Sequence, residues 1–186
     1  MQKTENEKLI LACRNHNYNQ IKQLLEHGAD PNSKDRNDNA IILSCRNIKT
    51  LRLLLDHGAD YNAFDDHGHV TIFGFSIWYY KYKCCKLLIE RGYDVNKKSY
   101  YGTYLFDALC ILQSPWYKGK RSVTVVNNII EIIKLLLKHV NKETLAFTGE
   151  QIYYRKTFME AIKPRYLVML FPEFAVTEGN PEYKLY

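Results

Sequence analysis

Apolar residues recur in a three-residue pattern at three places in the chain, each time followed by a glycine. In every copy they lie seven, four and three residues before that glycine, a spacing that puts three apolar side chains on one face of a helix. The glycine ends the helix, because it enters the left-handed backbone region without a Cβ clash. The three stripes are Ile21, Leu24 and Leu25 before Gly28; Leu51, Leu54 and Leu55 before Gly58; and Cys85, Leu88 and Ile89 before Gly92.

A second pattern lies upstream of each stripe. A small residue follows three positions after a larger apolar one, and the pairs are Ile10 with Cys13, Ile42 with Cys45, Phe73 with Ser76, and Leu105 with Ala108. The slot occupied by Lys8, Ala40, Thr71 and Thr103 recurs at steps of 32, 31 and 32. A fourth stripe before Val140 lacks the glycine. Each unit is therefore predicted to be a helix, a short turn, a second helix and a tight turn.

The residues of this unit resemble ankyrin repeats. Leu24–Asn32 is similar to the family's signature for the end of the second helix and the loop that follows it. Thr71–Ser76 and Thr103–Ala108 resemble degenerate forms of the family's T-P-L-H-x-A stretch. The resemblance implies an all-α ankyrin-repeat solenoid of helix-turn-helix units with connecting hairpin loops. No copy keeps the proline and histidine of T-P-L-H, so we expect the first helices to begin less sharply than usual.

The expected organisation is an ankyrin repeat domain over residues 1–173 and a tail over residues 174–186. The repeats span about 5–34, 35–64, 65–98 and 99–141, with an insertion over 113–125 and a degenerate helical C-terminal cap over about 142–173. Pro115 and Gly119 predict that the insertion is a loop. In the cap, Phe158 and Ala161 fit a first helix, and Leu167, Leu170 and Phe171 fit the stripe of a second.

Composition narrows the class of protein. A chain of 186 residues with 46% hydrophobic residues forms a core without disulfides or metals, and its apolar runs are far shorter than the ~20 residues of a membrane span. The N-terminus has no apolar signal segment, and the five cysteines form no CxxC pair. We expect a cytoplasmic monomer with reduced thiols and no cofactor.

Catalytic and metal chemistry find little support. Asp65, Asp66, His67 and His69 could supply metal ligands, but they fall in a predicted hairpin where exposed polar residues are expected, so we predict no metal site. The cysteines fill packing positions, and His27 and His57 precede the terminating glycines. Because no nucleotide-binding or hydrolase motif occurs either, we expect no enzymatic activity.

Partner binding is what stacked repeats offer, on one continuous concave face built in this family from the hairpin tips and first helices. Large or charged residues there are candidate contacts, and packing against neighbouring repeats is the alternative for the aromatic ones. The candidates at the tips are Arg36, Phe64, His67, His69, Lys98, Tyr100 and Tyr101, and those at the edge of repeat three and in the insertion are Trp78, Trp116 and Tyr117. We expect Trp78 to lie in the turn between the helices of repeat three.

Charge leaves a second class of ligand open. The chain has 26 basic and 20 acidic residues, and nine basic against three acidic residues lie between Lys81 and Arg121. Interleaved with the aromatic residues of region 78–121, they could bind nucleic acid or an anionic surface. The other interpretation is a solvated basic face, and no recognised nucleic-acid motif is present.

The resemblance carries two further implications. Ankyrin loops are often hydroxylated at the asparagine of the G-x-D-x-N turn, and Asn32, Asn62 and Asn96 match that position. A composition rich in Lys, Asn, Ile and Tyr resembles that of short ankyrin proteins from poxviruses and intracellular bacteria, which implies an effector or host-range protein that binds a host protein in host cytoplasm. The tail Val176–Tyr186 is similar to bacterial secretion signals, or is a disordered terminus.

Overall fold

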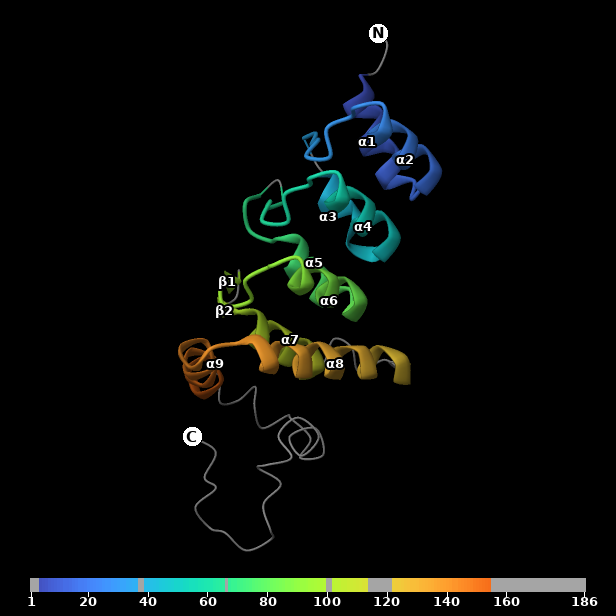
Figure 1. Ribbon diagram of the computed structural model, residues 1–186. Helices are drawn as coiled ribbons and strands as arrows, with labels where there is room; N and C mark the ends of the chain where they lie inside the picture. The colour runs from blue at the N-terminus through green and yellow to red at the C-terminus, as the bar shows by residue number, and fades with distance from the viewer. Residues whose placement is uncertain (1–3, 37–38, 66, 100–101, 114–121, 155–186) are drawn as a thin grey trace, which may run out of the picture.

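The computed structural model describes residues 4–36, 39–65, 67–99, 102–113 and 122–154, and its helices form pairs that stack one above another (Figure 1). The first helices of the pairs are α1 (Glu5–Arg14), α3 (Ala40–Leu43), α5 (Ile72–Trp78) and α7 (Tyr104–Gln113). The second helices are α2 (Tyr18–Glu26), α4 (Ile48–Asp56), α6 (Tyr82–Glu90) and α8 (Val123–His139). A short 3₁₀ helix, η1 (Ser44–Arg46), continues α3, and α9 (Lys142–Tyr154) follows the last pair.

Side chains that accept hydrogen bonds set most of the helix starts. Thr4 forms a capping box with Glu7 at α1, in which each side chain bonds the other residue's backbone N–H. Asn17 and Asn47 cap the second helices α2 and α4 in the same position, whereas Lys81 at the start of α6 forms no such bond. Capping satisfies backbone donors that the helix itself leaves unpaired.

Three second helices end in the same way. Gly28, Gly58 and Gly92 have φ of 86°, 89° and 90°, in the left-handed region that the sequence predicts for them. In the first copy the N–H of Gly28 bonds the carbonyl of Leu25, and the N–H of Ala29 bonds that of Leu24. The two bonds form a Schellman motif, which recurs at Gly58 and Gly92.

The core runs continuously through the stack, because first helices pack on first helices and second helices on second helices. Cys13, Cys45, Ser76 and Ala108, the small residues of the first helices, are at most 4% exposed. The stripes of the second helices are buried or half-buried against the same core. This arrangement confirms the all-α solenoid of helix pairs, and truncating one buried leucine to alanine would cost about 2–5 kcal/mol.

Hairpins connect each of the first three pairs to the next. Isolated bridges join Lys34 to Asn39 and Phe64 to Thr71, and the third hairpin pairs β1 (Lys98–Ser99) with β2 (Gly102–Thr103) in antiparallel register. The hairpins gather along one side of the stack (Figure 1).

Asparagine side chains join neighbouring repeats behind these hairpins. Asn32 Oδ1 accepts the N–H of Asp60 at 2.7 Å, and Asn96 Oδ1 accepts the N–H of Asn141 at 2.8 Å. In repeat one, Asn6 of α1 accepts the N–H of Asp30 at 2.9 Å. The oxygen of Asn62 instead accepts from the ammonium of Lys97, at 2.7 Å, so the link between repeats two and three differs from the others.

Three buried hydroxyl groups meet between repeats three and four. Thr71 Oγ1 lies 2.9 Å from Tyr93 OH and 3.0 Å from Tyr104 OH, and the two tyrosine oxygens are 2.6 Å apart. Each hydroxyl has one proton and can therefore donate one bond and accept another around a closed ring. Phe73 stacks on the Tyr93 ring with a centroid distance of 4.7 Å, which seals this hydroxyl ring in apolar surroundings.

The fourth pair departs from the expected insertion. Gln113 ends α7, and Val123–Val125 belong to α8, so both ends of the predicted loop 113–125 are helical. Ser122 caps α8 through the N–H of Val125, which explains why the helix starts there. Pro115 and Gly119 lie outside the described residues.

The expected cap also differs in its first element. Without a glycine at Val140, α8 ends in extended backbone and Asn141 immediately caps α9, accepting the N–H of Thr144 at 2.7 Å. α9 packs on α7 and β2, at the side of the hairpins (Figure 1). The cap helices predicted from Phe158, Ala161, Leu167, Leu170 and Phe171, and the tail after residue 173, lie outside the described residues.

Candidate binding surface

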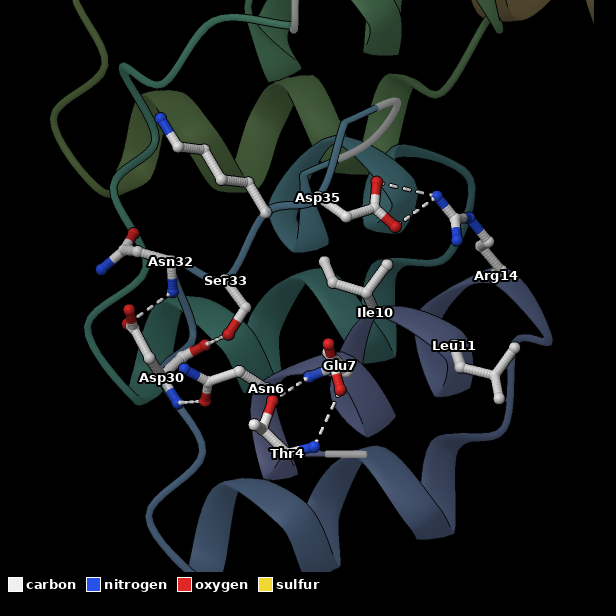
Figure 2. A pocket seen from close by; sticks show the side chains of 11 residues that line it. Thr4, Asn6, Glu7, Ile10, Leu11, Arg14, Asp30, Asn32, Ser33 and Asp35 are labelled. Atoms are coloured by element: carbon white, nitrogen blue, oxygen red, sulfur yellow. Dashed lines mark hydrogen bonds and ion pairs between the residues drawn. The ribbon is translucent and has the colours of Figure 1, made fainter. Parts of the chain in front are cut away.

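The hairpins and the exposed sides of the first helices form one surface, here called the hairpin face. At repeat one it contains a pocket of about 670 Å³ between α1 and the hairpin that follows α2 (Figure 2). The lining residues come from these two elements and are Thr4, Asn6, Glu7, Ile10, Leu11, Arg14, Asp30, Asn32, Ser33, Lys34 and Asp35.

Hydrogen bonds fix the walls of this pocket. The Nη2 atom of Arg14 donates to both carboxylate oxygens of Asp35, at 2.9 and 2.8 Å, and so ties the end of α1 to the hairpin (Figure 2). At the other end the bond from Asp30 to Asn6 closes the wall, and the Ser33 hydroxyl donates to the carbonyl of Asp30 at 2.5 Å. A partner would therefore meet polar groups that are already in place, which lowers the entropy cost of binding.

The pocket combines mixed charge with one apolar anchor. Leu11 is 39% exposed at its wall, while the neighbouring Ile10 is 2% exposed and belongs to the core. The lining contains the carboxylates of Glu7, Asp30 and Asp35 and the cations of Arg14 and Lys34, which is unlike the mostly apolar lining of small-molecule sites. Within the described residues, no group of three or more His, Cys, Asp or Glu could hold a metal ion.

The predicted tip residues are placed as follows. Arg36, His67 and His69 are exposed, and the two imidazole rings lie 6.3 Å apart. Phe64 is 53% exposed at the second hairpin. Lys98, also exposed, holds its ammonium 5.4 Å from the Phe147 ring of α9. Tyr100 and Tyr101 lie outside the described residues.

The predicted edge residues are arranged differently from the sequence interpretation. Trp78 is the last residue of α5 and not part of the turn, because α5 continues to it before the chain turns at Tyr79 and Tyr80. It is half-buried and packs edge-on against Phe75 at 5.5 Å, so packing accounts for much of its surface. Trp116 and Tyr117 lie outside the described residues.

Part of the predicted basic region is already neutralised. Arg91 pairs with Asp56 at 2.5 Å, and Lys86 lies 3.8 Å from Glu90. Lys118, Lys120 and Arg121 fall outside the described residues. Lys81 and Lys83 form no ion pair within the described ranges, so binding of nucleic acid or an anionic surface through region 78–121 stays a prediction.

The turn asparagines have structural bonds. The amide of Asn32 also donates to the carbonyl of Gly58 at 3.3 Å, and that of Asn96 donates to Asp94 at 3.1 Å. The side-chain oxygen of Asn62 accepts from Lys97, and the backbone N–H of Asn62 donates to Asp60 at 2.8 Å. Hydroxylation at Asn32, Asn62 and Asn96 stays a prediction, and the modifying enzyme would meet side chains that join repeats.

Cys13, Cys45 and Cys84 lack the environment of a nucleophile. Burial raises the pKa of Cys13 and of Cys45 to about 12, and that of Cys84 to about 11. A thiol with a raised pKa stays protonated at neutral pH and reacts slowly. The Nδ1 atoms of His27 and His57 each donate one bond, to the carbonyls of Gln23 and Leu53, at 2.6 and 2.8 Å.

Sequence reasoning missed the pocket at repeat one. Arg14 and Asp35 are 21 residues apart, and nothing in their spacing indicates that they form an ion pair. Leu11 carries the one available signal, because it is an apolar residue outside the pattern that the packing positions follow.

Part of the chain is similar to a known family of repeats. Residues 9–99 match ankyrin repeats, in three copies, and this match extends from within α1 to the end of β1. No curated protein matches the sequence. No helix in the described ranges is long and apolar enough to cross a membrane.

Proposed function

Because residues 9–99 form three ankyrin repeats, we propose that the chain is a non-catalytic module that binds a partner protein through its hairpin face. Such repeats are typically binding units, and their hairpin side is the concave side of the stack. The observation that carries the proposal is the pocket at repeat one, where exposed Leu11 sits among polar groups fixed by hydrogen bonds.

The chemistry of this face suits a protein surface. Leu11 and Phe64 supply two exposed apolar anchors, 39% and 53% exposed, on neighbouring repeats of the same face. Anchors of this kind carry most of the energy of an interface, while the polar rim excludes water and fixes the register. Arg36, His67, His69 and Lys98 are exposed around them and would form that rim.

The test is affinity capture from eukaryotic cell lysate, quantified by mass spectrometry, with wild type and the double variant Leu11→Ala/Phe64→Ala. Tyr18→Ala is the matched control, because Tyr18 is 36% exposed and lies on α2, away from the hairpins. We expect a protein whose capture falls about tenfold in the double variant and is unchanged in the control. Equal loss in both variants, or no captured protein, contradicts the proposal.

A host-directed role, as an effector or host-range protein in host cytoplasm, is the finer form of this proposal. Its support is the composition of the chain and its resemblance to short ankyrin proteins of intracellular pathogens. A specific partner found only in host lysate supports it, and a partner encoded by the organism that makes the chain contradicts it.

A further inference from the structure

The turns between first and second helices form an edge of the stack at the opposite ends of the helices from the hairpins. Two hollows of about 310 and 260 Å³ open along this edge. Both are lined by Arg46, at the junction of η1 and α4, and the two hollows together are here called the turn-edge groove.

Positive charge accumulates in the turn-edge groove. Its lining includes Arg14, Arg46, Lys81 and Lys83, and none of the described residues that line it carries a carboxylate. Arg14 is bonded to Asp35, but Arg46, Lys81 and Lys83 form no ion pair with any residue of the described ranges. Three cations that lack an acidic neighbour create a local field that attracts a carboxylate.

Arg46 lies against an aromatic ring in the groove. The guanidinium carbon of Arg46 lies 3.9 Å from the centre of the Tyr79 ring. Stacking uses the face of the guanidinium and leaves its N–H groups in the plane, where they can donate to both oxygens of one carboxylate. Tyr79 in turn stacks with Phe75, which limits its movement.

Apolar surface lies between these charges. Leu43, Ile48, Phe75 and Tyr82 line the hollows and are half-buried. On one side α8 forms a wall, because it has 17 residues where α2, α4 and α6 have nine, and it extends farther at this edge (Figure 1). Each hollow therefore has room for an aromatic or aliphatic side chain beside a carboxylate.

We propose that the turn-edge groove binds an acidic segment of a partner protein in which carboxylates flank an aromatic or aliphatic residue. Peptide is favoured over nucleic acid, because apolar side chains lie between the cations of the groove and because Lys86 and Arg91 are paired with Glu90 and Asp56. The groove shares Arg14 with the pocket of the hairpin face, but the proposal uses Arg46, Lys81 and Lys83 and does not rest on the function proposed above.

The test selects random peptides displayed on phage against the immobilised full-length chain. The groove variant is Lys81→Glu/Lys83→Glu. The control is Lys22→Glu/Lys86→Glu, which changes net charge equally on exposed lysines that face Glu26 and Glu90 elsewhere. We expect wild type and control to select peptides with Asp or Glu beside Phe, Tyr or Leu, and the groove variant to lose them.

Affinity then decides the outcome. The selected peptide should bind about tenfold more weakly to the groove variant, and less than about threefold more weakly to the control, by fluorescence anisotropy. Lys83→Glu alone, an exposed change, should show part of the loss even if Lys81→Glu disturbs the turn. Leu11→Ala/Phe64→Ala should leave the affinity unchanged, which separates this site from the hairpin face.

Three results overturn the proposal. One is a selection without acidic enrichment, and another is equal loss in groove and control variants. The third is an oligothymidylate that binds wild type more tightly than any selected peptide and is lost in the groove variant, because the groove would then be a nucleic-acid site.

Discussion

The hydroxyl ring of Thr71, Tyr93 and Tyr104 allows a quantitative test of how repeats three and four are joined. Tyr93→Phe removes two of the three bonds and keeps that between Thr71 and Tyr104, at 3.0 Å. A buried hydrogen bond contributes about 1 kcal/mol net, so the variant should lose about 2 kcal/mol of unfolding free energy. Tyr104→Phe removes two bonds in the same way and should cost as much.

The double variant Tyr93→Phe/Tyr104→Phe sharpens this prediction. It removes three bonds and not four, because the bond between the two tyrosines is shared by both single changes. The double variant should therefore lose about 3 kcal/mol, about 1 kcal/mol less than the sum of the singles.

Urea unfolding followed by far-ultraviolet circular dichroism measures these free energies. Tyr61→Phe is the control, because its ring meets Tyr93 edge-on at 6.0 Å but its hydroxyl forms no hydrogen bond within the described residues; we expect a change below about 0.5 kcal/mol. A Tyr93→Phe variant as stable as the wild type, or strictly additive losses, would refute the closed ring.

Three further predictions concern the same scaffold. Asn32→Ala should lower the free energy of unfolding in urea by about 1–2 kcal/mol, because it breaks the bond to Asp60. Asn62→Ala should lower it by less than about 0.5 kcal/mol, because its side chain loses only an exposed bond to Lys97. Equal losses in the two variants would contradict the asparagine links. The free energy of unfolding should stay constant up to the ordinary thiol pKa of 9.0 and fall as pH rises toward 12. Burial raises the pKa of Cys13 and Cys45 in the folded chain to about 12, so the unfolded chain loses these protons first. Urea unfolding curves that coincide at about pH 8 and about pH 10.5 would refute this. Gly58→Ala should cost about 1 kcal/mol by thermal unfolding, purely through its φ of 89°, because a Cβ there meets no atom within 4 Å; an unchanged midpoint would disprove it.

The parts of the fold that follow local rules were predictable from sequence. Helical spacing predicts the apolar stripes of the second helices and the small residues of the first helices, and the structure has both buried or half-buried as predicted. The glycines at 28, 58 and 92 predict a left-handed backbone conformation, and the structure has it at all three. Helix starts depend on single capping side chains, so the predicted loop of about 113–125 extends too far at its end, where Ser122 caps α8.

Other features depend on contacts between distant residues. In α9, Thr144 and Thr148 are buried while Leu145 and Phe147 are 46% and 38% exposed, the reverse of what hydropathy indicates. The Thr148 hydroxyl lies 2.8 Å from that of Thr103, and this polar partner, 45 residues away, explains the burial. The Arg14–Asp35 pair of the pocket escaped prediction for the same reason, because partner choice across repeats leaves no periodic signal.

Asn62 accepts from the Lys97 side chain, whereas Asn32 and Asn96 accept from backbone N–H groups of the next repeat, and this difference affects how the stack bends. Repeats one and two share a backbone-directed amide bond, and repeats three and four share both such a bond and the buried hydroxyls. Between repeats two and three the described side-chain links include the pairs Lys97–Asn62 and Arg91–Asp56, which water and salt can weaken, and the contact of Arg46 with the Tyr79 ring. When force or a bound partner bends the stack, we therefore expect the contact between repeats two and three to open first and to act as a hinge.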